Sequence, residues 1–352
     1  MNMNFKSLTT LVAAVAVQFA AWGADTRPIG VMDSGVGGLT VLERLLQHPG
    51  LAGERFSYAG DQANMPYGNY AAEGRTESLR RLIVRMAHFL TSDGYYLSPD
   101  DSEPKGEKTP AKIVIVACNT ATAYGLGDST AAFLGEGSRA KVIGIIEAGA
   151  RGAIDRLRLD RATGPVSIGV LATPGTIASG AYERAILAEL ARRGCTNEVK
   201  VVTESCEGLA DAIEFGLPDA DRIARESLVA LVRRSRESGC PPLATVILGC
   251  THYPFKLETL CKTRDELGAR FDFTDPAVLV AEECHAALES AGMLSDGAGA
   301  GPRLRCFFSV KAADSATRFT EVRGDRTPGG SLAQLLKLLP STARLFAEGR
   351  VR

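Results

Sequence analysis

Two cysteines, each directly after an apolar stretch and directly before polar residues, are the side chains of this sequence best suited to chemistry. Cys118 follows the apolar residues 113–117 and precedes Asn119 and Thr120. A thiol at a point where a strand runs into a helix lies near free backbone N–H groups. These groups and the helix dipole favour a thiolate and an anionic ligand. The simpler interpretation is a cysteine packed in the core, a common position for this residue type.

Cys250 repeats this arrangement after the apolar residues 245–248, with Thr251 and His252 directly behind it. A histidine two residues from a thiol can exchange a proton with that thiol or with a substrate amine. The alternative is a structural histidine bonded to backbone. Two matched cysteines are harder to explain as core residues than one.

A weak internal repeat connects the two cysteines. Residues 29–33 resemble 168–172, and residues 114–120 resemble 246–252, in the same order and at similar spacing. The alternative explanation of this likeness is that apolar β-branched runs are common in α/β proteins. We nevertheless predict two related α/β halves, each with a cysteine at the C-terminal end of a strand, where open α/β sheets bind ligands.

Three turns offer further polar groups. Residues 33–38 read Asp-Ser-Gly-Val-Gly-Gly, and such glycines bring backbone amides close to a ligand. Their spacing matches neither a dinucleotide fingerprint nor a P-loop. Asp33 is a candidate acid–base group or ammonium ligand, with helix capping as the alternative. Residues 66–68 form a turn sequence, and the hydroxyls of residues 173–176 are available to a carboxylate.

Alternating strands and helices must position these residues. Short apolar runs predict buried strands over 29–32, 112–117, 142–146, 166–171, 199–203 and 245–248. Amphipathic stretches predict helices over 39–46, 75–90, 181–193 and 220–236. This order indicates an α/β fold with mainly parallel sheets. Residues 92–110 interrupt it and predict an exposed loop insertion, and residues 295–302 predict a second flexible stretch.

The composition narrows the class of protein. A chain of 352 residues with 45% hydrophobic and 23% charged residues is typical of a globular protein of two domains. The net charge of −1 and the scattered basic residues argue against a nucleic-acid partner, although a small anion in a pocket is compatible with them. The four histidines form no ligand cluster and no C-x-x-C pair is present, so no metal site is expected.

The N-terminus has the pattern of a secretory signal peptide over residues 1–24. One lysine precedes an apolar run, and small residues follow it near a cleavage point. The run is short for a membrane span of about 20 residues. We therefore expect a periplasmic or exported protein. A misassigned start or an uncleaved anchor, and with it a cytoplasmic location, is the alternative.

Together these motifs resemble the glutamate racemase family of the aspartate/glutamate racemase superfamily, in family order over roughly residues 28–290. The matching segments are Asp33-Ser34-Gly35-Val36-Gly37-Gly38-Leu39, Pro66-Tyr67-Gly68, Ala117-Cys118-Asn119-Thr120-Ala121-Thr122, Gly175-Thr176 and Leu248-Gly249-Cys250-Thr251-His252-Tyr253-Pro254. The resemblance implies two pseudo-symmetric α/β domains with glutamate in the cleft between them. We place one discontinuous domain over 27–141 and 273–340, with Asp33 and Cys118. The other covers 142–272, with Cys250 and His252.

The resemblance also implies roles for individual residues. Cys118 would exchange a proton with D-glutamate and Cys250 with L-glutamate. Asp33 would assist Cys118, His252 would assist Cys250, and Glu214 would orient the histidine. The segment before Glu214 departs from the family, because Cys206-Glu207-Gly208 stands where a Cys-Pro pair is usual. The implied substrate-binding residues are Asp33, Ser34, Pro66, Tyr67, Gly68, Asn119, Thr120, Thr176, Thr251 and His252.

The expected reaction is racemisation without a cofactor, which would supply D-glutamate for peptidoglycan. A proton leaves one face of Cα and another arrives on the opposite face, so two groups are needed, one a thiolate and one a thiol. A free cysteine has a pKa of about 8.5, so the site must favour the thiolate. No lysine stands out as a Schiff-base residue, and preorganised donors in a dry cleft must meet the developing charge.

Other functions stay open at this point. The chain could be another racemase or isomerase of the superfamily, acting on aspartate, a hydantoin or maleate. It could also be an exported amino-acid-binding protein, although binding alone does not need two opposed thiols. The expected partner is a small molecule, and a homodimer is compatible with the sequence, which does not specify the oligomeric state.

Overall fold

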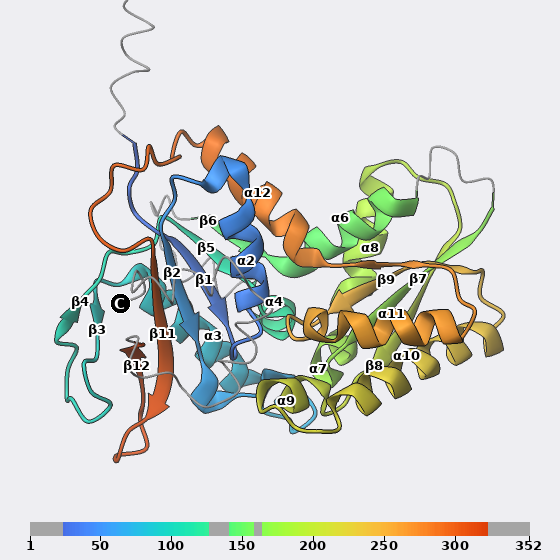
Figure 1. Cartoon of the computed structure of the whole chain (residues 1–352), viewed down its shortest axis with the longest axis horizontal. Coiled ribbons are helices and arrows are strands. Elements are labelled where there is room, and N and C mark those ends of the chain that lie inside the picture. Colours follow the sequence, from blue (N-terminus) through green and yellow to red (C-terminus); the bar gives the residue numbers. More distant parts are fainter. Residues whose placement is uncertain (1–23, 127–140, 158–163, 323–352) are drawn as a thin grey trace, which may run out of the picture.

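The computed structural model describes residues 24–126, 141–157 and 164–322, which form two parallel-sheet units joined by helices (Figure 1). The predicted signal peptide therefore lies almost entirely outside the described residues, as does the stretch 323–340 that we assigned to the first domain. Within those described ranges, no helix is long and apolar enough to cross a membrane.

The first unit is built on a six-stranded sheet in the order β12-β11-β2-β1-β5-β6. Its strands are β1 (Ile29–Asp33), β2 (Phe56–Gly60), β5 (Ile113–Val116), β6 (Lys141–Gly144), β11 (Leu304–Lys311) and β12 (Thr317–Glu321). All neighbours pair in parallel except β12, which runs antiparallel at the edge. The C-terminal ends of the central strands therefore meet at one edge, where Asp33 and Cys118 lie.

Helices cover both faces of this sheet. Ile29 and Val31 of β1 pack in the same apolar cluster as α2 (Leu39–Gln47), whereas Met32 packs on the other face with α3 (Thr76–Thr91). A strand buried on both faces has a continuous apolar sequence. This is why β1 is predictable without any alternation of polar and apolar residues.

The second unit contains a four-stranded, wholly parallel sheet in the order β10-β9-β7-β8. Its strands are β7 (Val166–Ala172), β8 (Val199–Ser205), β9 (Leu243–Gly249) and β10 (Asp272–Thr274). The helices that follow them are α7 (Pro174–Ser179), α8 (Ala181–Arg192), α9 (Leu209–Glu214), α10 (Ala220–Glu237) and α11 (Leu257–Glu266). Between the units, α6 (Ile145–Leu157) packs on α8, and α12 (Pro276–Ser290) packs on α6 and α2.

The predicted α/β class with mainly parallel sheets is confirmed, but two local predictions are wrong. Ile145 and Ile146 do not extend a strand, because they begin α6, whose first backbone N–H bonds the hydroxyl of Thr122 at 3.3 Å. Strand β6 pairs with β5 and therefore belongs to the first sheet. The chain leaves this sheet after Gly144 and not after residue 141, where we placed the domain boundary. Strands β2, β10, β11 and β12 were not anticipated.

The insertion 92–110 is also more ordered than an exposed loop. It contains a small antiparallel pair, β3 (Gly94–Tyr95) with β4 (Gly106–Glu107). Tyr95 is buried, and its ring lies 5.3 Å from that of Phe307 on β11. The aromatic side chain anchors the hairpin on the first sheet, a contact that local composition does not reveal.

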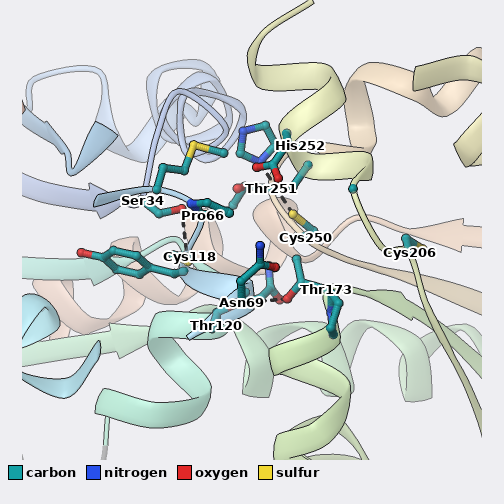
Figure 2. Close-up of a pocket in the computed structure, with 18 residues that line it drawn as sticks. Ser34, Pro66, Asn69, Cys118, Thr120, Thr173, Cys206, Cys250, Thr251 and His252 are labelled. Carbon is teal, nitrogen blue, oxygen red and sulfur yellow. Dashed lines mark hydrogen bonds between the residues drawn. The ribbon is translucent and has the colours of Figure 1, made fainter. Parts of the chain in front are cut away.

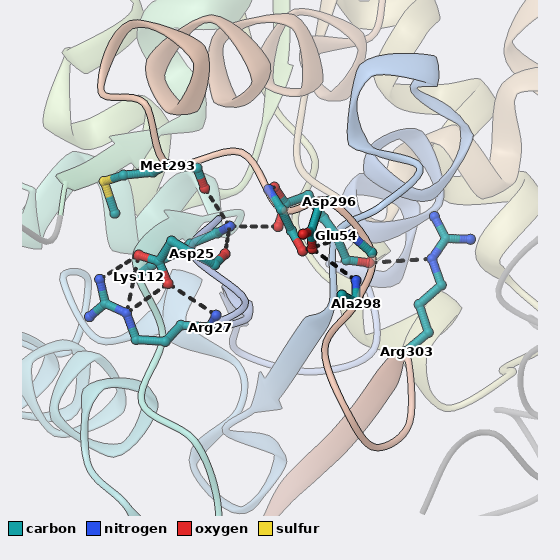
Figure 3. A network of polar contacts seen from close by, with 10 residues as sticks. Asp25, Arg27, Glu54, Lys112, Met293, Asp296, Ala298 and Arg303 are labelled. Carbon is teal, nitrogen blue, oxygen red and sulfur yellow. Dashed lines mark hydrogen bonds and ion pairs between the residues drawn. The ribbon is translucent and has the colours of Figure 1, made fainter. Parts of the chain in front are cut away.

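A buried ion pair between Lys112 and Glu54 connects several segments of the first unit (Figure 3). The Nζ of Lys112 lies 2.7 Å from Glu54 Oε2 and donates to the carbonyls of Asp25 at 2.6 Å and Met293 at 2.7 Å. The second oxygen of Glu54 accepts the backbone N–H of Ser295 at 2.8 Å. Both charged side chains are almost fully buried, so three distant segments depend on one cation.

We expect Lys112→Met to lower the free energy of unfolding by roughly 3–5 kcal/mol, because it leaves Glu54 charged, buried and unpaired. The double variant Lys112→Met with Glu54→Leu should regain most of this loss. Urea unfolding of the three proteins measures both effects. A single variant as stable as the wild type would contradict this structural role.

Candidate active site

A cavity lies between the two units, where strands from both sheets end (Figure 2). From the first unit, Ser34 follows β1 and Cys118 follows β5. From the second, Thr173 follows β7 and Cys250 follows β9. The structure thus brings both candidate cysteines to one cavity, each at the carboxyl end of a parallel strand.

Cys118 occupies the first of these positions as the N-cap of α4 (Asn119–Gly125). Its sulfur accepts the backbone N–H of Ala121 at 3.4 Å, and its thiol donates toward Ser34 Oγ at 3.9 Å. Burial, reinforced by the nearby charge of Asp33, raises the pKa of Cys118 well above its usual value. Burial therefore outweighs the one long amide contact at the helix terminus, and the pKa of Cys118 shifts in the direction opposite to the one that a helix terminus favours.

Cys250 has a different proton environment. Its sulfur lies 3.7 Å from Nδ1 of His252, and Nε2 of the same ring lies 2.7 Å from Glu214 Oε2. Burial alone would lower the pKa of His252, but its hydrogen bonds with Cys250 and Glu214 raise that pKa well above the usual value. The His252 ring therefore lies where it can exchange a proton with the Cys250 thiol.

Glu214 lies behind this histidine and does not line the cavity. It ends α9, which begins after Gly208 in the left-handed region at φ 73°. Its carboxylate also accepts the backbone N–H of Val36 at 3.0 Å and the side-chain amide of Gln62 at 2.8 Å. Glu214 therefore lies where it can orient the His252 ring, although residues 206–208 before it depart from the family pattern.

Asp33 and Thr176 likewise lie behind the cavity wall rather than in it. Asp33 accepts the backbone N–H of Gly35 at 3.0 Å and the hydroxyl of Thr251 at 3.1 Å. Thr176 shares hydroxyl contacts of 3.0 Å with Thr120 and Thr173. Of the candidate binding residues, Ser34, Pro66, Tyr67, Gly68, Asn119, Thr120, Thr251 and His252 do line the cavity.

Asn119 presents an unused donor. Its Oδ1 accepts the Tyr182 hydroxyl at 2.6 Å, which orients the amide. Its Nδ2 is buried and has no hydrogen-bond partner among the described residues. Buried polar groups in native proteins are normally paired, so a donor left open in a cavity indicates a place for an acceptor such as a carboxylate.

Several lining residues were not among the predicted site residues: Met65, Asn69, Thr173, Pro174, Cys206, Gly208, Ala210 and Asp211. The sequence predicts a turn around Thr173 and departs from the family around Cys206, but neither pattern indicates which side chains face a ligand. No group of three or more metal-ligating side chains occurs in the part of the chain that the structure describes.

Asp33 gives the site a pH-dependent stability. Burial, partly offset by His252 and the Gly35 amide, raises its pKa from 3.8 to about 6. Between these pH values the folded state binds more protons at Asp33 than the unfolded state, so this group's contribution to stability falls as pH rises.

We therefore expect the stability of the wild type relative to Asp33→Asn to decrease between about pH 4 and about pH 7. Urea unfolding of both proteins across this range measures the difference. Parallel pH profiles would show that Asp33 is not titrating with a raised pKa.

Known proteins are similar to this chain in sequence and in fold. A family model described as Asp/Glu/Hydantoin racemase matches residues 101–277. Glutamate racemase from Oceanobacillus iheyensis is 33% identical over 68% of this chain and 72% of that protein. Glutamate racemase from Pseudomonas paraeruginosa is 33% identical over 80% of this chain and 88% of that protein.

Solved structures agree with these relatives. A glutamate racemase isoform from Bacillus anthracis superposes with a TM-score of 0.61 and 31% identity, covering 81% of this chain and 90% of its own. Glutamate racemase from Francisella tularensis in complex with D-glutamate gives a TM-score of 0.59 and 26% identity, covering 83% and 91%. The resemblance carried by the motifs is thus confirmed, and the chain belongs to the glutamate racemase family, whose members are isomerases.

Proposed function

We propose that this enzyme interconverts L-glutamate and D-glutamate with Cys118 and Cys250 as acid–base groups on opposite faces of Cα, and without a cofactor. The observation that carries the proposal is the presence of two thiols in one cavity, each at a strand end of a different sheet. The relatives named glutamate racemase support the substrate, as does the relative solved with D-glutamate.

A two-base reaction requires the two thiols to be in different protonation states. Burial raises the pKa of Cys118 and so favours its neutral thiol, whereas the ring of His252 lies beside Cys250 and can take up the proton of that thiol. In the L-to-D direction the Cα–H bond of L-glutamate breaks and an S–H bond forms on Cys250. The Cys118 S–H bond then breaks and a new Cα–H bond forms on the other face. The enzyme ends with a Cys118 thiolate and a Cys250 thiol, the state that accepts D-glutamate.

Donors fixed before the reaction must stabilise the carbanion that forms between these steps. The open Nδ2 of Asn119 belongs to a residue that lines the cavity and suits the α-carboxylate, which takes up the developing charge. Glu214 keeps the His252 ring aimed at Cys250. Asp33 holds the Thr251 hydroxyl from behind.

A two-base reaction leaves an isotopic signature. When L-glutamate is converted in D₂O, we expect early D-glutamate to carry deuterium at Cα while the remaining L-glutamate keeps hydrogen. The new proton comes from a thiol that has exchanged with solvent, on the face opposite the one attacked. Mass spectrometry of separated enantiomers measures this. Retention of the original hydrogen in the product would overturn the two-thiol mechanism.

Cys118→Ala and Cys250→Ala should each lower kcat for racemisation by about 10²–10⁴, because each variant lacks one acid–base group. Cys195→Ala is the matched control, since this partly exposed cysteine does not line the cavity. Circular dichroism follows the reaction. Near-normal turnover in either cavity variant would contradict the assigned roles.

Substrate choice needs its own test. Racemisation of glutamate and of aspartate, assayed separately by circular dichroism, should favour glutamate. A clear preference for aspartate would move the enzyme to another activity of the superfamily. Inactivity toward both would overturn the proposed function and favour a hydantoin substrate or a binding role.

We further propose that the D-glutamate made by this enzyme is used for peptidoglycan. The signal-like residues 1–24 favour a periplasmic or exported enzyme, whereas the family's peptidoglycan role favours the cytoplasm. Cell fractionation, with the mass of the mature N-terminus, distinguishes the two locations. A full-length chain in the cytoplasmic fraction would overturn export.

A further inference from the structure

The cavity contains a carboxylate that the two-thiol mechanism does not use. Asp211 lies in the first turn of α9 and lines the cavity together with Cys206, Gly208 and Ala210. Its Oδ1 is buried and has no hydrogen-bond partner among the described residues. The residue as a whole is partly exposed, but its enclosed oxygen is an open acceptor that a donor from a ligand in the cavity would satisfy.

The charged groups that act on Asp211 are His252 and Glu214, and neither supplies that donor. Both ring nitrogens of His252 are engaged, one with Cys250 and one with Glu214. Glu214 is itself an acceptor. Burial raises the pKa of Asp211, and His252 opposes this shift.

Asp211 has a counterpart on another wall of the cavity. The Nδ2 of Asn119 is a buried donor without a partner, just as Asp211 Oδ1 is a buried acceptor without one. An amino acid carries one carboxylate and one ammonium group on the same carbon. The open donor suits the carboxylate, and the open acceptor suits the ammonium.

Other acids near the thiols are already occupied. Asp33 uses one oxygen for Gly35 N–H and the other for the Thr251 hydroxyl. Glu214 is bonded to His252, Val36 and Gln62. Asp211 is the single acidic side chain among the described residues that line the cavity.

We propose that Asp211 binds the α-ammonium group of the substrate while Asn119 binds its α-carboxylate. This assignment rests on the proposed function. When both the ammonium and the carboxylate on Cα are held in place, the Cα–H bond can point toward a thiol. A carboxylate beside the ammonium also favours its charged form, and that charge stabilises the carbanion formed when Cα loses its proton.

Glutarate provides a selective test, because it is glutamate without the ammonium group. Asp211→Asn keeps the shape of the side chain and removes its charge. We expect KM for L-glutamate and D-glutamate to rise about tenfold, while the inhibition constant of glutarate stays the same or falls. Glu207→Gln is the matched control, because it removes an exposed acid that lies just before α9 and outside the cavity, and it should change neither value.

An unchanged KM in Asp211→Asn, or an equal weakening of glutamate and glutarate, would overturn the role of Asp211. Unaltered urea unfolding of the variant shows that its fold is retained. Calorimetric binding of L-glutamate and glutarate to wild type and variant gives the same comparison without turnover. A wild type that binds glutamate but does not racemise it would thus overturn the proposed function alone.

Discussion

The site depends on the hydrogen bonds of one buried carboxylate, that of Glu214. Glu214 belongs to α9 of the second unit. Its carboxylate accepts the backbone N–H of Val36 and the side-chain amide of Gln62 in the first unit. The same group holds His252 at 2.7 Å. One charged side chain therefore fixes the distance between the units and the orientation of the ring that faces Cys250. An uncompensated charge at this depth would be costly, which explains why so many donors converge on it.

Further hydrogen bonds connect the two units around the cavity. The Thr251 hydroxyl reaches Asp33, Tyr182 reaches Asn119, and the hydroxyls of Thr120 and Thr173 lie 3.0 Å apart. In each case a residue of one unit orients a cavity residue of the other. These contacts between the two units thus help to set the geometry of the cavity walls.

The surroundings then make the two thiols unequal. Cys118 lies among groups that disfavour a negative charge and raise its pKa, while Cys250 faces the imidazole ring of His252. Two identical residue types therefore have different proton environments within one cavity. The approximate symmetry of the chain does not extend to its electrostatics, because His252 and Glu214 have no equivalents beside Cys118.

The sequence by itself determined the α/β class, the buried strands β1, β5, β7 and β9, and the position of a cysteine after two of them, because these are local patterns of apolar runs and turns. It also indicated most of the cavity's polar residues through their motifs. Tertiary structure alone decided that burial raises the pKa of Cys118, that Tyr95 anchors the insertion, and that Asp211 Oδ1 has no hydrogen-bond partner among the described residues. These properties arise from burial and from contacts between residues far apart in the chain, which no local pattern of residues records.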